Sequence, residues 1–292
     1  MLPVFRGPGL LMLFLYLVPG KTFANNPEAI YTGSILNEVF KKNQSIKTIS
    51  YTLRMKERIN NEYKLKKTDF KVSLKPYKVY LKQLSPDNIE ILYSKEETGD
   101  KAFLNRNSRA FSNMNLNPVG NMMRKESHHS IFKGGYNYLL DVLEHLYKKY
   151  PEDKTGNWQY EGMVKYNDVA CYKITFNNPG FSFTTYTIQA GENLEVLSQK
   201  LKICDYMIFE NNPKLKSFDD FKPGTVIRVP TDYAKQIILY IDAEKFLALG
   251  LKIFDDKGLF DEYTYENIML NPEFSDNEFR PENPAYGFMK RK

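Results

Sequence analysis

The chain has 292 residues, of which 42% are hydrophobic and 14% are aromatic, and its formal net charge is +6. This composition excludes an intrinsically disordered protein, and the length suits one large domain or two smaller ones. Lysines and acids are scattered along the chain without an arginine-rich block, so the sequence predicts no nucleic-acid partner.

The first 24 residues have the pattern of a secretory signal peptide. Arg6 precedes an apolar run over residues 10–18, and Thr22-Phe23-Ala24 offers small residues at the positions a signal peptidase inspects. The run is too short to cross a bilayer, which takes about 20 apolar residues. We therefore expect cleavage near Ala24 and export of a soluble chain to the periplasm or cell envelope.

The next segments predict a helix followed by a long series of strands. Ile30, Leu36, Val39 and Phe40 recur at helical spacing. From Ile46 the apolar residues alternate with polar ones, which is typical of half-buried strands. A second helix is expected after residue 135, with an apolar stripe that ends before Pro151. The predicted strands cover residues 49–59, 68–74, 77–84, 88–94, 101–106, 157–166, 170–176, 236–242, 248–256 and 260–270.

This series predicts an α+β fold. About nine or ten antiparallel strands with short turns favour one large curved sheet, with one face dry and covered by the two long helices. A packed pair of sheets is the main alternative, but it would leave the apolar stripes of both helices without an obvious surface.

Residues 184–230 form a small unit with an order of their own. A strand over 184–189 is followed by a turn at Ala190-Gly191, and Asn193 is a plausible N-cap for a helix. A second short helix follows, with Asp205 as its candidate cap, and residues 225–230 return as a strand. The inward positions of the two helices are Leu194, Leu197, Leu201, Met207 and Ile208.

This strand-helix-helix-strand unit resembles a LysM module, a small glycan-binding unit of cell-wall proteins. The matching residues are Tyr186, Ile188, Gly191, Leu194, Asn212-Pro213, Lys222-Pro223-Gly224, Ile227, Val229 and Pro230. The family's aspartate-threonine is replaced by Glu192-Asn193, which alters the rim of the sugar groove. The resemblance implies glycan-binding residues at Gly191, Glu192, Asn193, Leu194, Asn212, Pro213 and Lys214. In the alternative interpretation, Asn193 only caps a helix and Gly191 only turns the chain.

The two ends of such a module lie close together, so it can be inserted into a turn of another domain. We therefore expect one discontinuous host domain, made of residues 25–183 and 231–292. The host resembles a family of exported bacterial proteins of unknown function that is related in fold to LolA-type lipoprotein carriers. Its matching residues are Tyr240-Ile241-Asp242, Asp255, Gly258, Tyr263, Tyr265, Asn267, Asn271-Pro272 and Glu278-Phe279.

The host resemblance implies a half-barrel that sometimes encloses an apolar cavity for acyl chains. The residues that would line it are Tyr51, Leu53, Met55, Leu74 and Leu81. Periodicity does not distinguish a cavity from a packed core, and we expect the simpler arrangement, a solid core.

Few residues suggest a catalytic or metal-binding site. His128 and His129, beside Glu126 and with His145 further on, form the only cluster that resembles metal ligands, but adjacent side chains usually diverge, so no metal site is predicted. Cys171 and Cys204 are more simply buried apolar residues than a disulfide. The single tryptophan, at position 158, is expected in the core. We find no catalytic or phosphate-binding motif and predict neither an enzyme nor a cofactor.

The sequence therefore supports two functional hypotheses. The first is a non-enzymatic periplasmic protein that binds peptidoglycan or another N-acetylglucosamine polymer through the LysM-like module. The alternative is a carrier that holds a lipid or lipoprotein acyl chain in the half-barrel.

Overall fold

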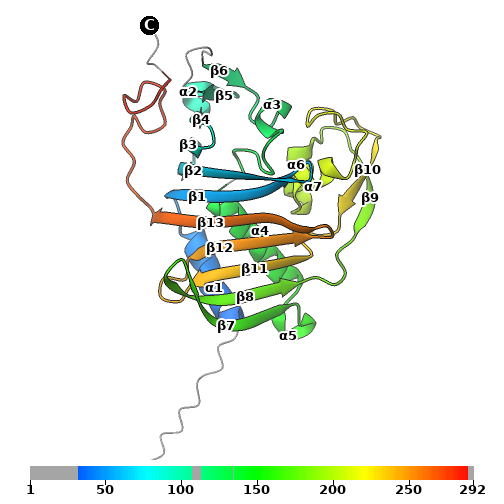
Figure 1. Cartoon of the computed structure of the whole chain (residues 1–292). Helices are drawn as coiled ribbons and strands as arrows, with labels where there is room; N and C mark the ends of the chain where they lie inside the picture. The colour runs from blue at the N-terminus through cyan, green and yellow to red at the C-terminus, as the bar shows by residue number, and fades with distance from the viewer. Residues whose placement is uncertain (1–31, 107–112, 134, 289–292) are drawn as a thin grey trace, which may run out of the picture. The chain divides into compact units, whose positions relative to one another are not determined.

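The computed structural model describes residues 32–106, 113–133 and 135–288, so the predicted signal peptide lies outside the described residues. The main feature is one antiparallel sheet of eleven strands, in the order β6-β5-β4-β3-β2-β1-β13-β12-β11-β8-β7 (Figure 1). The strands are β1 (Thr48–Ile59), β2 (Glu62–Leu74), β3 (Tyr77–Ser85), β4 (Ile89–Ser94), β5 (Ala102–Asn105), β6 (Met114–Leu116), β7 (Trp158–Tyr166), β8 (Val169–Asn177), β11 (Gln236–Asp242), β12 (Ala248–Asp255) and β13 (Gly258–Leu270).

Local sequence explains the longest hairpin of this sheet. Ile49, Tyr51 and Leu53 alternate along β1 and are buried, as the period of a half-buried strand requires. The hairpin between β1 and β2 turns at Asn60-Asn61, and both residues have positive φ angles, of 51° and 66°. Asparagine tolerates this left-handed conformation, so a two-residue turn can close the hairpin.

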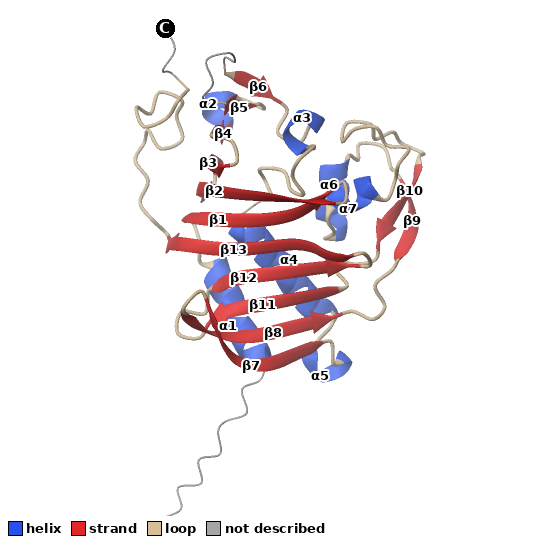
Figure 2. Cartoon of the chain, viewed as in Figure 1, coloured by secondary structure: helices blue, strands red, loops and turns tan. Residues whose placement is uncertain are grey.

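Two long helices, α1 (Thr32–Gln44) and α4 (Tyr136–Lys149), cover one face of the sheet (Figure 2). Their apolar stripes are buried, including Leu36 and Val39 of α1 and Leu143 of α4. The amide of Asn43 donates to Asp141, at 2.8 Å, where the helices meet. The predicted α+β fold, with a curved antiparallel sheet and two covering helices, is thus confirmed.

Several short elements differ from the sequence-based expectation. The sequence predicts a loop over residues 112–130, but this stretch includes β6 and a single helical turn, α3 (Asn121–Arg124). Two more single turns are α2 (Lys95–Thr98) and α5 (Glu152–Thr155). Such short elements lack a full period of apolar residues, so the periodicity of the sequence does not indicate them.

The segment after β13 has no clear sequence period, yet it packs in a defined place. Its aromatic residues Phe279, Tyr286 and Phe288 form a small second core with Tyr80 and Leu92. The rings of Tyr80 and Tyr286 are stacked, with centroids 3.7 Å apart. Contacts between segments that are far apart in the sequence decide this arrangement, so local pattern could not reveal it.

Residues 183–230 form a separate two-stranded sheet with two helices. β9 (Phe183–Thr187) pairs antiparallel with β10 (Val226–Pro230), and α6 (Leu194–Leu201) and α7 (Asp205–Glu210) lie between them in the chain. The ends of this segment come together, because Thr231 N–H donates to the carbonyl of Ser182 at 2.9 Å. The flanking strands β8 and β11 pair directly with each other.

Of the two N-caps predicted for α6 and α7, only the first is found in the structure. Asn193 caps α6 as predicted, since its Oδ1 accepts from the backbone N–H of Val196 at 2.8 Å. The prediction for Asp205 is wrong, because Cys204 occupies the N-cap position of α7, and its side chain makes no capping hydrogen bond. Asp205 instead lies in the first helical turn and is buried, where cations from another segment bind it.

A buried ionic cluster ties α6 and α7 to the loop before α4. Both terminal nitrogens of Arg124 donate to the carboxylate of Asp205, at 2.7 and 2.8 Å. The ammonium of Lys133 lies 3.5 Å from the same carboxylate and 3.1 Å from Glu195, and it also donates to the hydroxyl of Ser198. The side chains of Arg124, Lys133 and Asp205 are at most 1% exposed. This cluster is therefore fully desolvated.

We predict that Asp205→Asn lowers the free energy of unfolding by about 3–5 kcal/mol, because it leaves the buried guanidinium of Arg124 without the carboxylate that binds it. Urea denaturation followed by circular dichroism measures the change. Asp168→Asn is the matched control: Asp168 is exposed and pairs only with Lys165 among the described residues, so this change should stay within about 0.5 kcal/mol. A loss below about 1 kcal/mol for Asp205→Asn would contradict the assigned role of the cluster.

The cluster also predicts a pH dependence. Burial alone would raise the pKa of Asp205, but Arg124 and Lys133 outweigh it and hold the pKa well below its usual value. A carboxyl group whose pKa is lower in the folded state stabilises the fold above its unfolded pKa of about 3.9, and this contribution is lost as the pH falls. We expect the stability difference between wild type and Asp205→Asn to shrink by about 1 kcal/mol between pH 7 and pH 3. An unchanged difference in urea denaturation would argue against it.

Candidate functional site

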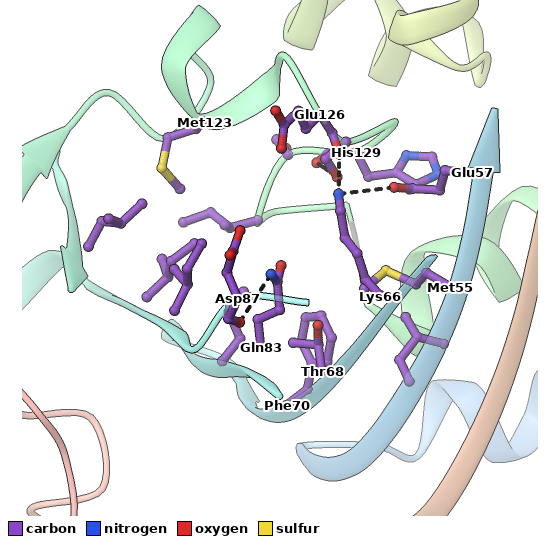
Figure 3. A pocket seen from close by; sticks show the side chains of 18 of the residues that line it. Met55, Glu57, Lys66, Thr68, Phe70, Gln83, Asp87, Met123, Glu126 and His129 are labelled. Carbon is purple, nitrogen blue, oxygen red and sulfur yellow. Dashed lines mark hydrogen bonds and ion pairs between the residues drawn. The ribbon is translucent and has the colours of Figure 1, made fainter. Parts of the chain in front are cut away.

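A pocket of about 180 Å³ lies between strands β1–β5 and the segment of residues 122–131 (Figure 3). Most of its wall is apolar and comes from both sides. The strands contribute Leu53, Met55, Phe70, Leu81, Ile91 and Leu104, and the covering segment contributes Met122, Met123 and Ile131. A cavity of about 150 Å³ with a comparable lining accepts a benzene-sized apolar molecule, so this pocket is large enough to bind a ligand.

Three of the five residues that were proposed to line a cavity do so, namely Leu53, Met55 and Leu81. Tyr51 lies outside the pocket, where its ring stacks on Phe70 with centroids 5.0 Å apart, and Leu74 also does not line it. The expectation of a solid core is therefore wrong at this end of the sheet. Residues 122–131 cover most of the strands here, with Leu139 of α4 at one side, and a space remains between the strands and this cover.

One end of the pocket is polar. The ammonium of Lys66 projects into it from β2, donates to the carbonyl of Glu126 and lies 3.5 Å from the carboxylate of Glu57. The hydroxyl of Tyr263 donates to the other oxygen of Glu57 at 3.1 Å. Burial would raise the pKa of Glu57, but Lys66 and the two neighbouring histidines outweigh it and lower the pKa. Glu57 is therefore an ionised, buried carboxylate at the pocket wall.

Behind Glu57, His128 is held between β1 and β13. Its ring stacks between the rings of Tyr206 and Phe260, with centroid-to-centroid distances of 4.3 and 4.0 Å. Nε2 lies 2.9 Å from the carbonyl of Arg58, which can only accept, so Nε2 carries a hydrogen. Nδ1 lies 2.6 Å from Asp261. Burial lowers the pKa of His128, but Asp261 and Glu57 outweigh it and raise the pKa.

The neighbouring His129 points elsewhere. Its Nε2 lies 3.1 Å from the hydroxyl of Tyr233, and burial lowers its pKa to about 3, so the imidazole is neutral. His145 is exposed on α4, away from these contacts. The histidines and Glu126 thus do not converge on one point, as expected from the divergence of adjacent side chains. Each of the two buried histidines instead joins a cluster of residues from distant parts of the chain.

A smaller cleft, of about 160 Å³, lies beside α6. Two of the residues predicted to bind a glycan, Asn193 and Leu194, line it. Other lining residues are Phe218, Asp219 and Phe221 from the loop after α7, and Asn117, Val119 and Arg124 from the segment around α3. The cleft therefore lies between the start of α6 and the loop after α7, and the α3 segment closes one side.

The other predicted glycan residues lie outside this cleft, and two of them, Glu192 and Asn212, are engaged within the chain. The carboxylate of Glu192 accepts from Tyr186, from the backbone of Gln189 and from Lys200, at 2.8–3.0 Å. The amide of Asn212 bonds to the backbone of Ile208 and Arg228. Gly191 turns the chain with a φ of +80°, and Pro213 and Lys214 are exposed. The roles of Gly191, Glu192 and Asn212 are structural whether or not a sugar binds.

The remaining residues singled out in the sequence are structural. Cys171 and Cys204 are free and buried, as expected for small apolar residues, so they form no bridge with each other. Trp158 is 4% exposed and donates its ring N–H to the carbonyl of Tyr150 at 2.9 Å, which confirms its place in the core.

Sequence reasoning missed Glu57, Lys66 and Asp261. A signal for two of them was present in the strand pattern, because Glu57 continues the buried face of Leu53 and Met55, and Asp261 occupies the same face as Tyr263. A charged residue on a dry face requires a partner, since burying an unpaired charge is costly. The identity of that partner depends on which strands and loops meet.

Comparisons with solved structures give only distant likenesses. The lipoprotein LppX of Mycobacterium tuberculosis matches at 13% identity with a TM-score of 0.39, and the match covers 84% of this chain and 100% of that one. An uncharacterised conserved protein of Thermus thermophilus matches at 10% identity with a TM-score of 0.37, and the match covers 85% of this chain and 91% of that one. A LolA superfamily protein of Nitrosomonas europaea matches at 9% identity with a TM-score of 0.29, and the match covers 86% of this chain and 98% of that one. Likenesses this low carry no argument about function.

No curated protein matches the sequence. Within residues 32–106, 113–133 and 135–288, no helix is long and apolar enough to cross a membrane. A family described as a protein of unknown function, DUF1571, matches residues 46–189 and 223–288. The match covers well over half of the chain and leaves out residues 190–222, which contain α6 and α7. The chain belongs to the DUF1571 family.

Proposed function

We propose that this protein is a non-enzymatic carrier that binds the acyl chain of a lipid or lipoprotein in the pocket between β1–β5 and residues 122–131. The observation that carries the proposal is the pocket itself, with an apolar wall of leucine, isoleucine, phenylalanine and methionine. Removing apolar surface from water contributes about 25 cal/mol of favourable free energy for each Å². An alkyl chain that covers this wall therefore binds favourably.

The size of the pocket limits the ligand. Sites for drug-sized molecules occupy roughly 300–1,000 Å³, whereas this pocket encloses about 180 Å³. It therefore suits a segment of one chain rather than a whole lipid. Met55 and Met123 lie on opposite sides of it, and the flexible methionine side chain adapts to ligands of different length.

The polar end supports an amphiphilic ligand. The ammonium of Lys66 lies at this end, where it donates to Glu57 and to the carbonyl of Glu126, and His129 and Tyr263 also line it. An alkyl chain would occupy the apolar part, and its polar head would meet these groups or the solvent. The predicted export signal favours action in the periplasm or cell envelope, where such ligands occur.

We predict that Met55→Trp weakens binding of the fluorescent C18 fatty acid cis-parinaric acid by at least about tenfold, since the larger ring fills the pocket. Fluorescence titration of the purified protein measures the dissociation constant. Met163→Trp is the matched control, because Met163 lies on β7, is 52% exposed and does not line the pocket. Equal affinity in wild type and Met55→Trp, or no binding by wild type, would rule out this site.

A second function has two observations in its favour. The cleft beside α6 lies between the loop before α6 and the loop after α7, and it contains two phenylalanines, Phe218 and Phe221. The family match is interrupted at residues 190–222, which supports the insertion of a module at 184–230 into a host of residues 25–183 and 231–292. We propose that a peptidoglycan or N-acetylglucosamine chain binds there, with Asn193 and Leu194 at the wall.

The glycan proposal predicts that the protein co-sediments with purified peptidoglycan and that Phe221→Ala weakens this binding about fivefold, through loss of an aromatic contact of about 1 kcal/mol. Val226→Ala is the control, since Val226 is exposed on β10 and lies outside the cleft. Wild-type protein that stays in the supernatant would exclude glycan binding, and the acyl-chain proposal would not be affected.

A further inference from the structure

Glu57, His128 and Asp261 meet in the interior although they come from distant parts of the sequence. One donor atom of each, a carboxylate oxygen or a ring nitrogen, lies within 4.8 Å of the donor atoms of the other two. All three residues are buried, and the side chains of His128 and Asp261 are 0% exposed. They come from β1, the loop before α4 and β13, so the tertiary fold assembles the group.

We propose that Glu57, His128 and Asp261 form a binding site for one divalent transition-metal ion of the zinc type. The donor set is one imidazole nitrogen and two carboxylate oxygens, which are ligands that Zn²⁺ accepts in proteins. Three protein ligands leave a coordination position for water or for a polar group of another molecule.

The surroundings of His128 match those of a metal ligand. A ligating histidine usually donates its other ring N–H to a carbonyl or carboxylate, which fixes the ring and the tautomer. Nε2 of His128 donates to the carbonyl of Arg58 at 2.9 Å, so Nδ1 is the nitrogen that faces the carboxylates. The rings of Tyr206 and Phe260 hold the imidazole on both faces.

The carboxylates have matching surroundings. Glu57 accepts from the hydroxyl of Tyr263 at 3.1 Å and from the backbone N–H of His128 at 3.3 Å, which orients it toward the group. Asp261 bonds to His128 through Oδ1, while its buried Oδ2 has no hydrogen-bond partner among the described residues. A buried carboxylate oxygen without a partner is costly, and a cation would satisfy it.

A second group of donors, His129, Cys204 and Asp205, lies close by but has a different charge balance. Both oxygens of Asp205 are already bound by Arg124, and Lys133 lies 3.5 Å away, so two cations oppose the entry of a third. In the group of Glu57, His128 and Asp261, two carboxylates face one nearby ammonium, that of Lys66. The charge balance therefore favours this group.

The pocket offers a route to the site, because Glu57, a member of the group, lines its polar end together with Lys66. Lys66 has a flexible stem on β2, and its ammonium is 3.5 Å from Glu57, so it can move aside when a cation takes its place as counter-charge. An ion can thus enter from the side on which the pocket opens.

The test is a Zn²⁺ titration of purified, EDTA-treated protein against a chromophoric chelator. Wild type should bind one equivalent, and Asp261→Asn and Glu57→Gln should each bind it at least about tenfold more weakly, because each removes a charged ligand. Cys204→Ser should bind as wild type does, since Cys204 belongs to the other group. Circular dichroism confirms that each variant is folded, and Glu57→Gln replaces Asp261→Asn if the latter does not fold.

Two results would overturn the proposal. If wild type binds no Zn²⁺, the three residues form only an ion-pair and hydrogen-bond cluster with Lys66. If Cys204→Ser loses the ion while Asp261→Asn and Glu57→Gln keep it, the ion occupies the other group. Neither result would affect the binding of cis-parinaric acid, which is measured separately.

Discussion

The buried pairing of Arg124 and Asp205 is the contact on which the arrangement of the functional elements depends. It joins α7 to the segment of residues 117–133, which in turn covers the pocket beside β1–β5 and closes one side of the cleft beside α6. Desolvating these charges is costly, so the fold keeps them only because the geometry is bidentate and Lys133 adds a second cation. One segment thus contributes to both candidate binding sites.

Further polar contacts join α7 to the large sheet. Arg58 on β1 bonds to Asp255 and lies 3.7 Å from Glu210 on α7, and Glu210 also pairs with Lys257 at 2.8 Å. The hydroxyl of Tyr206 accepts from the backbone N–H of Asn60 at 3.1 Å. The segment that the family match leaves out is therefore held against the large sheet by directional polar contacts rather than by apolar packing alone. Because these contacts are directional, they fix the position of residues 190–222 against the sheet.

The sheet itself could be anticipated in large part, whereas the sites could not. Alternation along Ile49, Tyr51 and Leu53 is a local property, and so is the N-cap at Asn193, because both follow from the backbone geometry of a few residues. The pocket depends on what lies above the strands, and the covering segment of residues 122–131 has no period that indicates its path. For this reason the alternation predicts the face on which Leu53 and Met55 lie, but it does not predict the space beside them.

The sequence by itself determined the α+β class, the two long helices, the succession of antiparallel strands and the pair of short helices α6 and α7. Each follows from repeating patterns or caps within about a dozen residues, where side-chain direction is fixed by the backbone. Only the tertiary structure decided that Asp205 binds Arg124 instead of capping α7, and that His128 meets Asp261 at a separation of 133 positions. Such contacts depend on how distant strands and loops come together, because burial gives each charged group a strong need for a partner without specifying which one.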